Sequence, residues 1–209
     1  SRAQPKQPEA VRKTSNGKFG RLVLLGASAG GPAALANVLA ALPENFPAPV
    51  IIVQHLAQQF VAELTSWLAQ QARLPVRLAR ENEVMQPGTI YMPGRDAHLV
   101  LRDRYRLAYE QEPRNHPYRP SIDQLFFSVA RHWNNGVIGV LLTGMGRDGA
   151  EGLRALRDAG ALTITQDRES SVVYGIPKAA AKINAAAEIL PLDKIGKRIA
   201  TAVAAHSEA

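Results

Sequence analysis

Apolar runs alternate with amphipathic segments along most of the chain. Three runs have the character of buried strands, because no charged residue interrupts them: Leu22–Leu25, Val50–Val53 and Val137–Leu142. Apolar side chains at helical spacing predict helices over 30–42, 60–73, 150–159 and 192–205, and a further helix that is capped by Ser121 and runs through His132. Strands that alternate with helices form βαβ units. The sequence therefore predicts an α/β fold, a doubly wound and mainly parallel sheet flanked by helices.

A different pattern occupies the stretch between Val76 and Glu110. Apolar residues alternate with period two over 89–92, 98–101 and 106–109, and turn residues such as Pro87-Gly88 and Pro93-Gly94 separate these runs. Such short runs between turns are typical of strands. We expect them to include an antiparallel hairpin on an edge of the sheet.

Each of the three buried runs is followed by a residue with catalytic chemistry. Ser28 lies in a Gly-x-Ser-x-Gly turn, His55 follows the second run, and Asp148 lies in a glycine-rich loop after the third. The carboxyl ends of parallel strands open into one crevice, so these side chains are expected to meet there. A hydroxyl, a base that takes its proton and a carboxylate that orients the base are the set that acyl transfer requires.

Other interpretations of these residues remain open at this point. The order Ser28, His55, Asp148 differs from that of α/β-hydrolases, and a binding module whose turn after the first strand cradles a phosphate or nucleotide at a helix N-terminus is an alternative. His116 is the rival base, and His98 is expected to be a structural histidine on an exposed face. On composition alone, the carboxylate has five rivals: Asp96, Asp103, Asp123, Asp158 and Asp167.

Five segments, taken together, resemble the catalytic domain of the CheB-type protein-glutamate methylesterases. They are Gly26-Ala-Ser-Ala-Gly-Gly31, Gln54-His55, Arg119-Pro-Ser-Ile-Asp123, Leu142-Thr-Gly-Met-Gly-Arg-Asp-Gly149 and Val172-Val-Tyr-Gly-Ile-Pro177. The resemblance runs from about residue 21 to about residue 200. It implies that Ser28 is the nucleophile, His55 the general base and Asp148 its orienting carboxylate.

The resemblance also implies an activity and a partner. The expected reaction removes methyl esters from glutamate side chains of a chemoreceptor-like protein and deamidates glutamines, without a cofactor or a metal. Ala29 and Met145 are expected at the oxyanion pocket, and Arg119 or Arg147 is expected to help dock an acidic receptor. Ala29 stands where many relatives carry threonine, and Tyr118 where relatives commonly carry histidine.

Bulk properties set the limits of this interpretation. The chain has 209 residues, a net charge of +7 and no cysteine, which favours one α/β domain in a reducing cytoplasm. No apolar run is long enough to cross a bilayer, and the sequence starts without an apolar signal core, so membrane insertion and secretion are not expected. A small-ester hydrolase with the same triad remains an alternative.

The charge is concentrated at the start of the chain. Residues 1–20 carry five basic residues and one glutamate, and their Ser, Gln, Pro and Lys content is typical of a flexible linker. The family resemblance implies that a receiver domain precedes this linker in a longer parent protein, and a free-standing enzyme with a basic tail is the alternative. The predicted catalytic domain spans 21–205, and 206–209 are expected to fray. The folded remainder is near charge balance, which does not favour nucleic-acid binding.

Overall fold

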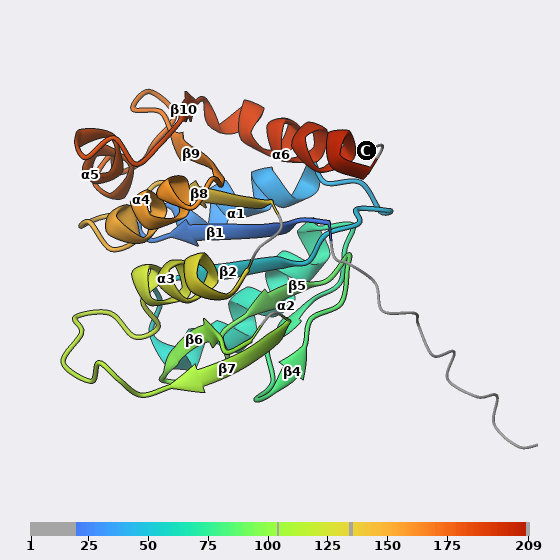
Figure 1. The fold of residues 1–209 in the computed structure, drawn as a ribbon, viewed down its shortest axis with the longest axis vertical. Helices are drawn as coiled ribbons and strands as arrows, with labels where there is room; N and C mark the ends of the chain where they lie inside the picture. Colours follow the sequence, from blue (N-terminus) through green and yellow to red (C-terminus); the bar gives the residue numbers. More distant parts are fainter. Residues whose placement is uncertain (1–19, 104, 134–135, 208–209) are drawn as a thin grey trace, which may run out of the picture.

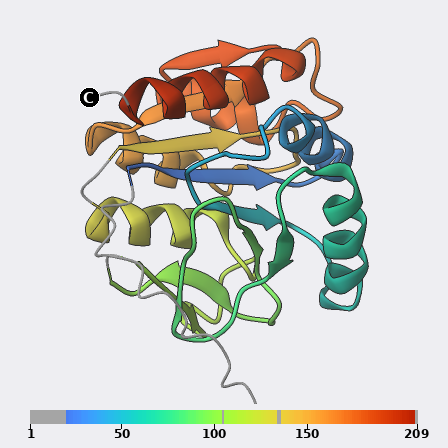
Figure 2. The ribbon, with the colours of Figure 1, turned by 90° about the vertical axis from the view of Figure 1, so that its right-hand side faces the viewer.

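A central seven-stranded sheet organises the molecule in the computed structural model, which describes residues 20–103, 105–133 and 136–207. All its neighbouring strands are parallel, in the order β10-β9-β8-β1-β2-β5-β3. Figure 2 shows the main strands side by side and pointing the same way. The strands are β1 (Leu22–Ala27), β2 (Val50–Gln54), β3 (Val76–Leu78), β5 (Ile90–Met92), β8 (Val137–Leu141), β9 (Leu162–Gln166) and β10 (Glu188–Leu190).

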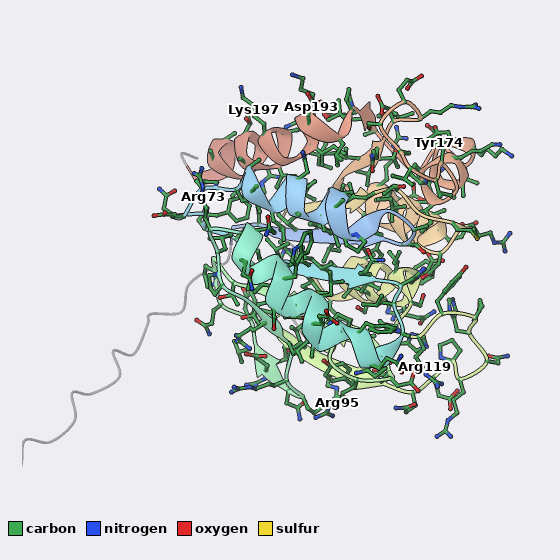
Figure 3. The ribbon with its side chains drawn as sticks, turned by 180° about the vertical axis from the view of Figure 1, so that it is seen from behind. Arg73, Arg95, Arg119, Tyr174, Asp193 and Lys197 are labelled. Atoms are coloured by element: carbon green, nitrogen blue, oxygen red, sulfur yellow. The ribbon has the colours of Figure 1, made fainter. Side chains whose placement is uncertain are left out.

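Helices cover both faces of this sheet. One face packs against α1 (Gly31–Ala40), α2 (Val61–Gln71) and α6 (Leu192–Ser207), and a short 3₁₀ helix, η1 (Gln58–Phe60), precedes α2. The other face packs against α3 (Ile122–His132), α4 (Ala150–Asp158) and α5 (Ile176–Lys182). Figure 1 shows α3 and α4 in front of the strands. Figure 3 shows the molecule from behind, with α1, α2 and α6 together in front of the sheet. The doubly wound parallel fold is confirmed.

Strand β1 illustrates how the sequence builds the two cores. Its side chains alternate between faces, as period-two geometry requires. Val23 and Leu25 enter the core under α1 and α6, whereas Leu22 and Leu24 enter the core under α3 and α4. Because both faces of this central strand are covered, every one of its residues is apolar or glycine and fully buried.

The antiparallel hairpin exists, but its place differs from the sequence expectation. Strands β6 (His98–Leu101) and β7 (Arg106–Glu110) form it, and β4 (Glu83–Val84) joins them in a separate three-stranded sheet, in the order β4-β7-β6. It packs against α3 instead of extending the main sheet. The edge position is instead taken by β3, which pairs in parallel with β5.

The chain reverses direction across the sheet beside β1. After β1 it builds the sheet through β2 towards β3, and it then returns to β8 on the other side of β1 and continues to β10. Such a switch point opens a crevice at the carboxyl ends of the strands. All but the last residue of the predicted linker 1–20 lies outside the described residues, as do 208 and 209, while α6 continues to Ser207.

Candidate active site

Ser28 follows β1 in a turn that its neighbours hold tightly. The Ser28 N–H donates to Thr143 O (3.1 Å), and the Ser28 carbonyl accepts from Gly31 N (2.8 Å) and Gln54 Nε2 (2.9 Å). Gly30 adopts a φ of 77°, a left-handed conformation that favours glycine. Within the described residues the Ser28 hydroxyl has no hydrogen-bond partner, so it is available for chemistry.

His55 follows β2 and lies beside the same turn. Its N–H donates to Ala27 O (3.0 Å), which ties its backbone to the end of β1. Its Nε2 lies 2.7 Å from Asp148 Oδ2. Because a carboxylate only accepts, this nitrogen donates, and Nδ1 of the neutral ring is then an acceptor. Nδ1 is buried and has no partner among the described residues.

Asp148 is buried where the loop after β8 meets the start of α3. Its Oδ1 accepts from Ser121 Oγ (2.7 Å) and Asp123 N (3.1 Å), and its Oδ2 also accepts from Ile122 N (2.7 Å). Burial favours the neutral acid, but the hydrogen bonds from His55, Ile122 and Ser121 outweigh it and lower the pKa of Asp148. The N-terminus of a helix adds favourable partial charge. The side chain is therefore held as a carboxylate at neutral pH.

The loop Thr143–Gly149 lies directly against the serine turn. A Cβ added at Gly144 would lie 2.7 Å from Ser28 Cβ and 3.0 Å from Ser28 N, so only glycine fits there. The segment Val172–Pro177 fixes this loop, because Gly144 N donates to Val173 O (3.0 Å) and Ile176 N donates to Gly144 O (2.9 Å). Segments 142–149 and 172–177, two of the five that carry the family resemblance, thus hold the Gly144 backbone against Ser28.

Ala29 and Met145, the residues expected at the oxyanion pocket, flank the close approach of Gly144 to Ser28. Ala29 follows Ser28 directly, and its carbonyl accepts from Thr143 Oγ1 (3.0 Å). Met145 follows Gly144, and its side chain is 64% exposed, so simple core packing does not explain it. In the described part of the chain, neither the Ala29 N–H nor the Met145 N–H donates a hydrogen bond, which leaves both free for an incoming oxygen.

The segment between β7 and α3 brings further side chains to the site. Tyr118 stacks on the His55 ring, with ring centroids 4.0 Å apart and an interplanar angle of 1°. His116 Nδ1 lies 3.1 Å from Tyr118 N, and its Nε2 lies 3.9 Å from Asp148 Oδ1. The contacts of the His116 ring thus include Tyr118 and, at a longer distance, the carboxylate. Arg119 is held by Asp96 through two contacts of 3.0 and 3.1 Å.

The prediction for His98 is wrong in one respect. His98 is fully buried instead of lying on an exposed face. Its Nδ1 accepts from Ser121 N (3.1 Å) and its Nε2 lies 3.2 Å from Pro113 O, which fixes the neutral tautomer. Burial lowers the pKa of His98, consistent with the structural role that the sequence indicated.

The rival carboxylates have other contacts. Asp96 pairs with Arg119, Asp158 with Arg154, Asp103 accepts from the Tyr105 and Arg106 amides, and Asp167 accepts from Ser170. Asp123 Oδ1 accepts from Gly152 N (2.6 Å). Asp148 is thus the carboxylate that contacts His55, as the sequence indicated.

Two cavities open beside the site, with Tyr118 in the wall of both. The larger, the Arg147 cavity, has a volume of about 580 Å³, and Asp148, Arg147, Lys178 and Lys182 contribute to its lining. The smaller, the His55 cavity, has a volume of about 270 Å³, and Leu56 and Arg119 line it together with His55. Figure 3 places Arg119 and Tyr174 at the carboxyl ends of the strands, and Arg119 lines the His55 cavity there.

Comparison with known proteins now decides the family. The family model described as CheB methylesterase matches residues 23–199, which is most of the chain. The chain belongs to the CheB methylesterase family. A protein-glutamate methylesterase/protein-glutamine glutaminase of Pseudomonas syringae is 54% identical over 190 residues, covering 91% of this chain and 56% of the relative. Another of the same name from Pseudomonas fluorescens is 52% identical over 199 residues, with 95% and 58% coverage.

A solved structure agrees with this CheB assignment. The crystal structure of the Thermotoga maritima CheB methylesterase catalytic domain matches with a TM-score of 0.83 and 32% identity, covering 88% of this chain and 98% of that one. The chain spans a little more than half the length of the two curated relatives. None of the helices in the described part of the chain has the length and apolar character needed to cross a bilayer.

Two residues with site contacts were missed or only partly recognised from sequence. Ser121 was expected only as a helix cap, which it is, because it accepts from Gln124 N. Its hydroxyl also donates to Asp148, and its position just after Arg119-Pro120 in a quoted segment was the available signal. Tyr118 was noticed as a departure, but nothing in the sequence indicated its stack on His55.

Proposed function

We propose that this chain hydrolyses methyl esters on glutamate side chains of chemoreceptor-like proteins in the cytoplasm, and deamidates glutamines at the same site. The observation that carries the proposal is the His55 ring, whose Nε2 is bonded to a buried carboxylate while Nδ1 is buried without a partner among the described residues, on a residue whose backbone N–H is tied to Ala27, next to Ser28. The names of the relatives support the same reaction.

The proposed chemistry has two halves. As the Ser28 hydroxyl attacks the side-chain carbonyl of the methylated glutamate, His55 Nδ1 takes its proton, and Asp148 stabilises the resulting imidazolium. The N–H groups of Ala29 and Met145 stabilise the oxyanion. His55 returns the proton to the leaving methoxide, which departs as methanol. Water then gives a proton to His55 and attacks the acyl-serine, which restores the serine and releases the glutamate carboxylate. With ammonia as leaving group, the same steps deamidate glutamine.

The cavity favours a protein substrate over a small ester. The Arg147 cavity is partly open to solvent and has charged side chains in its lining, whereas a small-ester hydrolase requires a closed apolar pocket. Its basic residues Arg147, Lys178 and Lys182 form no ion pair among the described residues, so they are available to an acidic receptor. A phosphate-binding module would leave the His55–Asp148 pair without a purpose.

A regulatory partner is part of the proposal. We infer that the parent protein carries a receiver domain ahead of this chain, as the family resemblance implies. The length of the curated relatives beyond the matched part leaves room for it. Reading the complete coding sequence tests this inference, and a parent protein without such a domain would contradict it.

Methanol release from a methylated receptor cytoplasmic fragment tests the reaction. We expect release by this chain and none above background by Ser28→Ala. Ser66→Ala is the matched control, because Ser66 is an exposed serine on α2 away from the site. Equal release by all three chains would contradict the role of Ser28, and no release by any of them, with several folded receptor fragments, would contradict the proposed substrate.

A further inference from the structure

The ring of Tyr118 lies flat against the ring of His55. The centroid distance is 4.0 Å and the planes are within 1° of parallel. The His55 side chain is 8% exposed, so this contact contributes to a nearly closed environment. A stack covers only the face of an imidazole and leaves its edge free. Both ring nitrogens of His55 therefore remain open to partners in the plane, one of which is Asp148.

The neighbours of Tyr118 hold it in place independently of any substrate. His116 Nδ1 lies 3.1 Å from the Tyr118 N–H and 2.8 Å from its carbonyl oxygen. On the other side, Arg119 is tied to Asp96 by a double contact. Segment 116–119 is thus anchored at both ends of the tyrosine. The ring is preorganised against His55.

The far end of Tyr118 reaches the loop after β8. A Cβ added at Gly146 would lie 2.9 Å from the Tyr118 hydroxyl, and Gly146 has a φ of 89°. The ring therefore extends from the proposed base towards the loop that carries Met145. It also stands in the wall of both the Arg147 cavity and the His55 cavity. Substituting Tyr118 therefore changes the surroundings of the His55 ring directly, and it affects the backbone of the main sheet less.

Stacking has a consequence that depends on the protonation of His55. An aromatic face attracts a cation, and it attracts a protonated imidazole more strongly than a neutral one. The titratable side chains next to the His55 ring are Asp148, which contacts Nε2, and behind that carboxylate His116, whose Nε2 lies 3.9 Å from Asp148 Oδ1. A contact that strengthens as the proton arrives stabilises the transition state more than the ground state, and so raises kcat.

We propose that Tyr118 is a positioning residue for His55: its ring fixes the imidazole plane, so that Nδ1 faces the serine turn while Nε2 stays on Asp148, and it stabilises the imidazolium. This inference rests on the proposed function of the His55 base. It assigns the role to the aromatic face of Tyr118 and not to its hydroxyl.

The test compares Tyr118→Leu, which keeps apolar bulk, with Tyr118→Phe, which keeps the ring. We expect kcat for methanol release to fall about tenfold in Tyr118→Leu with KM nearly unchanged, and Tyr118→Phe to stay within about twofold of the parent. Because Leu offers the imidazolium no aromatic face, the acid limb of the pH–kcat profile should lie at lower pH in Tyr118→Leu than in Tyr118→Phe. Tyr105→Leu, far from the site, is the control and should retain kcat.

A second readout separates the inference from the proposed substrate. The rate at which a fluorophosphonate modifies Ser28 depends on the base but not on a receptor, and it should fall in Tyr118→Leu in the same proportion as kcat. Thermal unfolding of each variant confirms that it is folded. A leucine variant with parental kcat and labelling rate, a change confined to KM, or a phenylalanine variant as impaired as the leucine one would each overturn the inference. If methanol is not released by the parent chain but labelling still falls, only the substrate proposal fails.

Discussion

Two regions of the molecule build the site in different ways. The turns after β1, β2 and β8 are held by backbone hydrogen bonds between neighbouring strand ends, such as His55 N to Ala27 O and Leu142 N to Gly26 O (2.8 Å). The segment 111–121, between the small sheet and α3, contacts the same site through side chains, with Tyr118 on His55 and Ser121 on Asp148.

The difference separates placing reactive groups from tuning them. The backbone of the strand ends holds the turns that carry Ser28 and His55 against each other, and the Asp148 carboxylate contacts the His55 ring, which is the placement that the proposed chemistry needs. Side chains from segment 111–121 contact His55 and Asp148, and we propose that they adjust the orientation and charge of those two groups. Substituting one of the proposed reactive groups in the strand-end turns should accordingly cost far more activity than a substitution in segment 111–121.

The largest expected contrast is between Asp148→Asn and Ser121→Ala. An amide at 148 favours the wrong tautomer of His55, and we expect kcat to fall about 10³- to 10⁴-fold. Removing the Ser121 hydroxyl leaves the carboxylate and two backbone donors in place, so we expect a loss of about tenfold or less. Steady-state methanol release measures both. Comparable losses would erase the distinction between the two regions.

A pair of glycines tests whether backbone contact at the serine turn matters. A Cβ at Gly144 would collide with Ser28 Cβ and Ile176 Cδ1, both at 2.7 Å, so Gly144→Ala should displace the nucleophile and cost at least about tenfold in kcat. Gly160 has a φ of 89° at the end of α4, away from the site, with no atom within 4 Å of an added Cβ. Gly160→Ala should therefore cost about 1 kcal/mol of unfolding free energy and no activity. Thermal denaturation and kinetics on both variants distinguish the cases, and unimpaired Gly144→Ala would argue against the contact.

Two arginines, one from each region, sharpen the comparison for substrate docking. Arg147 belongs to the loop after β8 and is exposed at the large cavity, whereas Arg119 belongs to segment 111–121 and is paired with Asp96. We expect Arg147→Glu to raise KM about five- to tenfold at low salt, and the effect to shrink as salt is added. Arg119→Glu should have the smaller effect. A KM for the receptor fragment that is insensitive to Arg147→Glu would remove the docking role.

The smallest effect concerns Asp123, which lies just beyond segment 111–121. Burial raises the pKa of this carboxyl from 3.8 to about 6. A folded-state pKa above the unfolded value means that the associated stability is present below pH 3.8 and is lost as the pH rises through about 6. Asp123→Asn removes that loss, so the unfolding free energy at pH 7 should rise by about 1 to 3 kcal/mol. Urea unfolding at pH 4 and pH 7 measures this, and an equal change at both would contradict the assignment.

The sequence was informative where the parallel sheet dictates geometry. The three apolar runs identified β1, β2 and β8, and the crevice rule for parallel strands brought His55 and Asp148 together from 93 residues apart. The glycine-rich loop after the third apolar run favoured Asp148 over the other carboxylates, and Asp148 is the one that contacts His55.

The remaining features depend on contacts that no local pattern encodes. Segment 111–121 has no periodicity, so neither the Tyr118 stack nor the Arg119–Asp96 pair was predictable. The alternation around His98 gave the strand but not which face would be covered, because the covering helix α3 lies far along the chain. The hairpin was placed on the main sheet for the same reason, since pairing partners are set by tertiary packing.

The most direct test of the account is the site of covalent trapping. Treating the folded chain with a fluorophosphonate and mapping the modified peptide by mass spectrometry should give one adduct, on Ser28. The adduct should form far more slowly in His55→Ala and Asp148→Asn, since both remove activation of the hydroxyl. Modification of another serine would contradict the claim that Ser28 is a nucleophile activated by His55 and Asp148. A labelling rate in these two variants equal to that of the parent chain would contradict it as well.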